Sequence, residues 1–99
     1  MSTIVSATIV VNLNGNVKLT RVNQKMALLS SVHVITASMR IAFFLSKAKS
    51  AFDLKVSDAV FVELRDHSLC RQKGLVVRSA TVQKLAPKVF AITYLMAFV

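Results

Sequence analysis

VHVITASMR, residues 32–40, is the stretch on which the fold prediction depends. Its polar residues Thr36, Ser38 and Arg40 occupy every second position, so in an extended chain all three would point to the same side. The next five residues, IAFFL, are strongly apolar, which raises the alternative of a helix buried in lipid. The β-branched residues and the alternating polarity favour a strand, whose polar face would then offer hydrogen bonds to a partner.

The membrane alternative extends over residues 26–45. These 20 residues include 14 apolar ones, which is the length that crosses a bilayer. Arg40 and His33 would be costly within lipid, and the serines and threonine of the segment lower its hydropathy. A strand therefore fits better, and the lipid-buried helix stays as the alternative.

Composition points to burial against a partner and to a polyanion. The 99 residues are 55% hydrophobic, and 13 Lys and Arg stand against 4 Asp and Glu, a formal charge of +9. Mean hydropathy is +0.60. The positive charge favours nucleic acid or an anionic membrane, while the apolar surplus favours burial in lipid or in a second copy. We expect one domain over residues 1–99, and no populated monomer at micromolar concentration.

The remaining segments predict a mainly β protein. Residues 8–22 flank Asn14-Gly15 with β-rich runs and predict a hairpin with a type I′ turn, placing Val10 opposite Leu19. Residues 23–31 fit a loop or a turn of helix, and residues 52–65 fit one bulged strand or two short ones. Residues 66–74 fit a connection, and residues 75–83 fit another strand. Residues 86–99 fit a short C-terminal helix with Pro87 in its first turn, or a final strand.

We find no pattern that indicates catalysis or a cofactor. His67 and Cys70 lie three apart, but a zinc site needs three or four ligands and only His33 remains to add. Cys70 is the single cysteine and cannot form an internal disulfide. We therefore expect no enzyme activity, no metal and no cofactor.

Two motifs carry a resemblance to a known family. ITASMR (35–40), a basic loop and FDLKV (52–56) resemble the central hairpin of the coat proteins of single-stranded RNA bacteriophages, and the hairpin ending in KLTRVNQ (18–24) is similar to the start of some members. The resemblance covers residues 3–56. It implies an α+β, mainly β fold, with an N-terminal hairpin and antiparallel sheet followed by C-terminal helices, in which two subunits join into one continuous sheet.

The resemblance also implies a function. Coat dimers build an icosahedral shell in the virion, after assembly in the host cytoplasm. The inner sheet face binds the viral single-stranded RNA, and in several members it represses replicase translation. Thr36, Ser38, Arg40 and Lys55 match the family's strand motifs and would face the RNA. The alternatives are a membrane- or lipid-associated viral accessory protein, with residues 26–45 and 86–99 in lipid, and a basic protein of a ribosome-like particle.

Overall fold

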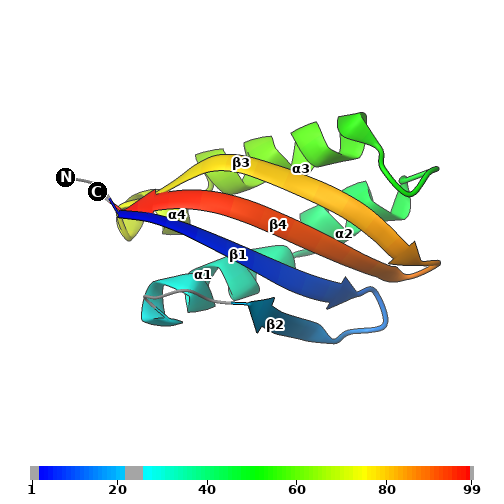
Figure 1. The fold of residues 1–99 in the computed structure, drawn as a ribbon, viewed down its shortest axis with the longest axis horizontal. Helices are drawn as coiled ribbons and strands as arrows, with labels where there is room; N and C mark the ends of the chain where they lie inside the picture. Colours follow the sequence, from blue (N-terminus) through cyan, green and yellow to red (C-terminus); the bar gives the residue numbers. More distant parts are fainter. Residues whose placement is uncertain (1–2, 22–25, 99) are drawn as a thin grey trace.

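The protein is an α+β domain in which helices cover one face of an antiparallel sheet (Figure 1). The computed structural model describes residues 3–21 and 26–98. In chain order the elements are β1 (Thr3–Asn12), β2 (Val17–Arg21), α1 (Met26–Thr36), α2 (Met39–Ser46), α3 (Leu54–Asp66), α4 (Ser68–Gln72), β3 (Leu75–Ala86) and β4 (Val89–Phe98). The strand order is β2-β1-β4-β3. The predicted α+β class, antiparallel sheet and N-terminal hairpin are confirmed.

The two terminal strands form the centre of the sheet. β1 and β4 pair antiparallel over ten positions, from Thr3 opposite Phe98 to Asn12 opposite Val89. The start of β1 at Thr3 and the end of β4 at Phe98 therefore lie side by side (Figure 1). All four helices fall between the two hairpins in sequence. This order differs from the one that the phage coat resemblance implies, where the helices follow the sheet.

The N-terminal hairpin closes one residue away from its predicted register. Val10 faces Lys18 and Val11 faces Val17, and the Asn12 N–H donates to the Asn16 carbonyl at 2.8 Å, which leaves residues 13–15 as a three-residue loop. The Gly15 N–H donates to the Asn12 carbonyl at 3.0 Å, and Gly15 has φ of +112°. A turn followed by a glycine with positive φ is the usual three-residue solution, so the predicted two-residue type I′ turn is wrong. The Asn12 side chain, which accepts the Asn14 N–H at 2.9 Å, holds this loop.

The predicted strand in residues 32–45 is wrong, because the segment forms the second part of α1 and all of α2 except Ser46. The buried residues of α1 and α2 recur at helical rather than alternating spacing: Leu29, Val32, Ile35, Thr36, Ile41 and Leu45. The two helices are separated at Ser38, which caps the second. The sequence predicts a loop or a turn of helix for residues 23–31; residues 26–31 form the start of α1, and residues 23–25 lie outside the described residues.

Two further predicted elements change identity. Residues 54–66 form α3 rather than a strand, and Asp53 caps its N-terminus. Of the two alternatives for residues 86–99, the short C-terminal helix is wrong and the final strand is confirmed, because residues 89–98 form β4. Pro87 lies in the turn between two paired strands rather than in a first helical turn. The predicted strand 75–83 is confirmed and extends to Ala86, while the predicted connection 66–74 contains the short helix α4.

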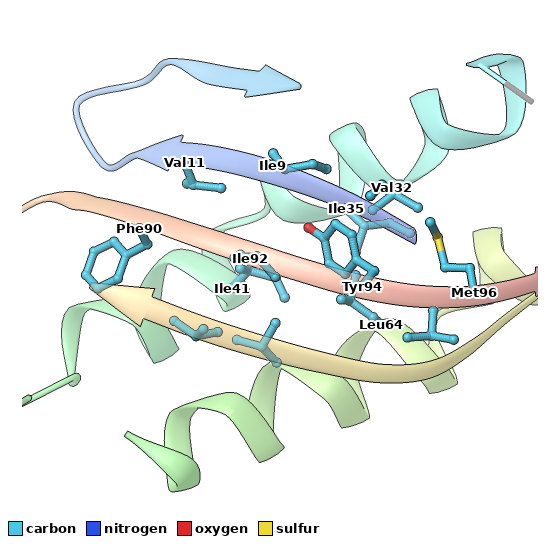
Figure 2. Packing of buried hydrophobic residues seen from close by; sticks show 14 of the residues in the cluster. Ile9, Val11, Val32, Ile35, Ile41, Leu64, Phe90, Ile92, Tyr94 and Met96 are labelled. Atoms are coloured by element: carbon cyan, nitrogen blue, oxygen red, sulfur yellow. The ribbon is translucent and has the colours of Figure 1, made fainter. Parts of the chain in front are cut away.

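The core lies between the sheet and the helices (Figure 2). Alternate residues of the central strands point into it: Val5, Ala7, Ile9 and Val11 from β1, and Phe90, Ile92, Tyr94 and Met96 from β4. They meet side chains of the helices, among them Val32, Ile35, Ile41 and Leu64. Because side chains alternate across a strand, the intervening residues of β1 and β4 lie on the sheet's other face.

Candidate nucleic-acid interface

The face of the sheet that bears no helix is a candidate interface; we call it the open face. In β4, Thr93 and Leu95 are exposed between the buried Ile92, Tyr94 and Met96. The paired strands continue this surface on both sides. Its members are Ser6, Thr8 and Val10 of β1, Ala91, Thr93 and Leu95 of β4, and Ser79, Thr81 and Gln83 of β3. This surface is three strands wide, and five of its nine residues carry a hydroxyl group.

A row of threonines crosses the open face. The register places Thr8 opposite Thr93, and Thr93 opposite Thr81. The Thr8 and Thr93 hydroxyls are hydrogen-bonded to each other at 3.2 Å. On the outer side of β1, Arg21 lies opposite Thr8 and continues the row. Three hydroxyls and a guanidinium therefore follow one line perpendicular to the strands.

The charge on the sheet has one sign. Lys18 and Arg21 lie on β2, and Arg78 lies at the bulge of β3 between Val77 and Ser79. No Asp or Glu occurs within the four described strands. All four acids of the chain belong to α3 or lie directly before it: Asp53, Asp58, Glu63 and Asp66. An anion that approaches the open face therefore meets cations and hydroxyls without a carboxylate among them.

Two of the predicted RNA-binding residues serve the helices instead. Thr36 is 1% exposed, and its hydroxyl donates to the Val32 and His33 carbonyls of α1 at 2.9 and 3.0 Å. Ser38 caps α2, where its hydroxyl accepts the Ile41 N–H at 3.3 Å. Their hydroxyls stabilise the ends of helices, so the predicted shared strand face is wrong.

The other two predicted residues are exposed cations on the helical side. The Arg40 Nε donates to a Glu63 carboxylate oxygen at 2.8 Å, and its guanidinium lies 5.7 Å from the centre of the Phe44 ring. Lys55 lies in the first turn of α3, beside a pocket that also contains Lys47 and Lys49. Arg40 and Lys55 therefore lie away from the open face.

The groups first weighed as metal ligands have structural roles. The His67 Nδ1 caps α4 by accepting the Leu69 N–H at 3.2 Å. Cys70 is buried, and burial raises the pKa of its thiol. Within residues 3–21 and 26–98, no three His, Cys, Asp or Glu side chains are grouped so that they could hold a metal ion.

Tyr94 is a fully buried ionisable residue on the covered face. Its hydroxyl has no hydrogen-bond partner among the described residues. Burial raises the pKa of Tyr94 far above its usual value. The nearby Thr36 hydroxyl donates its hydrogen to the carbonyls of α1 rather than to the phenol oxygen. The neutral phenol is therefore the stable form inside the fold.

In the described part of the chain, no single helix is both long and apolar enough to cross a bilayer. Leu29–Thr36 and Met39–Ser46 meet the length and composition only when taken together, and they are bent by 61° to each other.

No protein-family model, curated protein or solved structure matches the chain. The relation to phage coat proteins therefore stays a prediction from the motifs within residues 3–56.

Proposed function

We propose that the protein binds single-stranded RNA on the open face of its sheet, as a viral coat protein that dimerises and assembles around the genome. One observation carries the proposal. The open face combines a row of threonine hydroxyls with Lys18, Arg21 and Arg78, and no carboxylate lies on any described strand.

The chemistry of this face suits RNA. Hydroxyl groups can bond to phosphates, to ribose hydroxyls and to the edges of splayed bases. Lys and Arg supply an electrostatic term that weakens with salt. The aromatic residues of β4 that are fully buried, Phe90 and Tyr94, point into the core. Contacts to phosphate and sugar therefore dominate over base stacking, which favours packaging of RNA of many sequences over recognition of one hairpin.

Assembly is supported by the apolar side chains that the fold leaves exposed on its helices. Val34 is 64% exposed, Met39 is 88% exposed and Phe43 is 55% exposed. Mean hydropathy of the chain is +0.60. A second copy packed on the helical side would remove these side chains from water and leave the open face free for RNA.

Filter binding over a salt series tests the RNA site. Lys18→Gln and Arg78→Gln should each weaken RNA binding and lower the log–log salt slope by about 0.7, because each removes about one phosphate contact. Thr93→Val should leave the slope unchanged and cost about 0.5–1.5 kcal/mol of binding free energy, since it removes a hydrogen bond. Lys73→Gln is the matched control, because Lys73 is exposed at the end of α4.

Equal affinity and equal slope in Lys18→Gln, Arg78→Gln and the wild type would remove the open face from the RNA site. Sedimentation of the expressed protein tests assembly separately. Large particles that contain RNA are the expected result. A dispersed monomer without detergent would contradict assembly, and dependence on detergent would favour a membrane-associated protein instead.

A further inference from the structure

A pocket of about 640 Å³ lies where the end of α2 meets the start of α3. We call it the lysine pocket, after Lys47, Lys49 and Lys55 in its wall. Phe44, Phe52 and Asp53 are also among its lining residues. The volume lies within the range typical of small-molecule sites.

The lysine pocket is electropositive. Its described lining holds three lysines and one carboxylate, so its formal charge is +3 − 1 = +2. In the described parts of the chain, none of these lysines forms an ion pair within 4.0 Å. The Lys47 ammonium lies 4.2 Å from the centre of the Phe43 ring, outside any carboxylate contact. These ammonium groups are available to an anionic ligand.

The single carboxylate of the pocket lining is hydrogen-bonded to backbone N–H groups. Asp53 accepts the Lys55 and Val56 N–H groups at 3.1 and 3.2 Å, and the Lys49 N–H at 3.4 Å. The bond from Val56 contributes most to holding the pKa of Asp53 below its usual value. Asp53 thus fixes the pocket wall and offsets only part of its positive charge.

The same pocket presents an aromatic ring to solvent. Phe52 is 61% exposed, although it is large and apolar. Two backbone contacts hold its loop against β3: the Lys84 N–H donates to the Ala51 carbonyl at 2.8 Å, and Phe52 forms a β-bridge with Gln83. An exposed ring on a loop whose backbone is held in this way, beside lysines, can stack on a flat aromatic group that carries negative charge.

We infer that the lysine pocket binds a nucleoside phosphate, with the base against Phe52 and the phosphate groups among Lys47, Lys49 and Lys55. A free nucleotide and a nucleotide within single-stranded RNA both supply this chemistry. Gln83 belongs to the open face and pairs with Phe52, so a strand that crosses the edge of β3 would reach the pocket. The pocket is a site separate from the open face, and its chemistry does not depend on that face.

Isothermal titration of the full chain with ADP tests the site. Lys49→Gln and Lys55→Gln should each weaken ADP binding about tenfold, because each removes a charged phosphate contact. Phe52→Ala should weaken ADP binding about tenfold through lost stacking, but leave the binding of pyrophosphate unchanged. Lys73→Gln and Lys18→Gln are the controls, and both should bind ADP as the wild type does. The Lys18→Gln control separates this site from the open face.

Competition then identifies the source of the nucleotide. Displacement of a labelled oligouridylate by ADP, lost in Lys55→Gln, would place a nucleotide of RNA in the lysine pocket. RNA binding unaffected by ADP, with ADP binding still sensitive to Lys55→Gln, would assign the pocket to a free nucleotide. The inference is overturned if ADP does not bind at millimolar concentration, or if Lys73→Gln weakens binding as much as Lys55→Gln. Vesicles of phosphatidylglycerol bound through Phe52 in a protein that binds no ADP would overturn it in favour of a lipid surface.

Discussion

The two faces of the central strands differ although their residues alternate along the same backbone. Ile9 and Ile92 face each other on the covered side and are 0% exposed. Thr8 and Thr93 face each other one residue away on the open side, where Thr93 is exposed. The covered face binds the helices to the sheet, so its side chains are constrained by packing. The open face contributes little to that packing and is free to carry the chemistry of a binding surface.

Hydroxyl groups on the two faces also differ in their hydrogen bonding and in their access to solvent. On the open face, Thr8 and Thr93 bond to each other and remain within reach of a ligand. On the covered face, the Tyr94 hydroxyl is buried without a hydrogen-bond partner among the described residues. A polar group therefore costs stability on one face and can serve binding on the other.

The largest expected effect on stability comes from alanine substitutions at two neighbouring positions of β4 that lie on opposite faces of the sheet. Ile92→Ala should destabilise the protein by about 2–5 kcal/mol, because it leaves a cavity in the core. Thr93→Ala, at the next position, should change the free energy of unfolding by no more than about 0.5 kcal/mol. Urea unfolding followed by circular dichroism measures both. Similar losses in the two variants would mean that the open face is also packed, for example against a second copy.

A smaller effect is expected at the hairpin loop that sets the register of β1 and β2. Gly15 has φ of +112°, and a Cβ atom there would meet nothing within 4 Å. Gly15→Val should therefore cost about 1–3 kcal/mol through backbone strain alone. Lys18→Val, at an exposed strand position of the same hairpin, should stay within about 0.5 kcal/mol. Equal thermal unfolding of both variants would contradict the loop geometry.

The strands were predictable from sequence where alternation met a clear turn signal. Asn14-Gly15 located the first hairpin, although not its register, because Asn-Gly serves both two-residue and three-residue loops. In residues 32–45 two patterns overlap. Thr36, Ser38 and Arg40 alternate, yet the first ends α1, the second caps α2 and the third is exposed in the first turn of α2. The alternation spans the break between α1 and α2, so it does not correspond to one face of a strand.

The helices had signals of their own that the alternation obscured. Ser38 and Asp53 are residue types that favour the N-cap, and each precedes a helix. Val56, Val60 and Leu64 recur every four residues and form the buried side of α3. The exposed Val62 completed a false alternation with Val60 and Leu64, which favoured the strand.

The candidate site could not be located from local sequence. Thr8 and Thr93 are 85 positions apart, and their contact depends on the pairing of the first and last strands. Thr81 joins them only through the register of β3, which shifts at the bulge beside Arg78. The expectation of a polar and basic sheet face survives as a proposal, but its residues come from the ends of the chain rather than from 35–55.

The smallest effect concerns Tyr94, the polar exception on the covered face. Tyr94→Phe should raise the free energy of unfolding at neutral pH by about 0.5–1 kcal/mol, because it removes a buried hydroxyl that lacks a hydrogen-bond partner. Thermal unfolding of both proteins at pH 7 measures the difference. A loss of stability would show that the hydroxyl is bonded in the folded protein.

The alkaline range sharpens this test, because burial raises the pKa of Tyr94 in the folded state. In the unfolded chain the phenol ionises near its ordinary pKa of about 10. The folded protein keeps the proton above that pH, so stability is full below about pH 10 and falls as pH rises further, by about 1.4 kcal/mol per pH unit. Tyr94→Phe lacks this loss, whereas the buried Cys70, whose pKa is also raised, is present in both proteins and cancels in the comparison.

Since Tyr94 is the only tyrosine and the chain has no tryptophan, absorbance of the phenolate reports this group alone. Phenolate that appears near pH 10 before the protein unfolds would show that Tyr94 is accessible to water and that the covered face is open at this point.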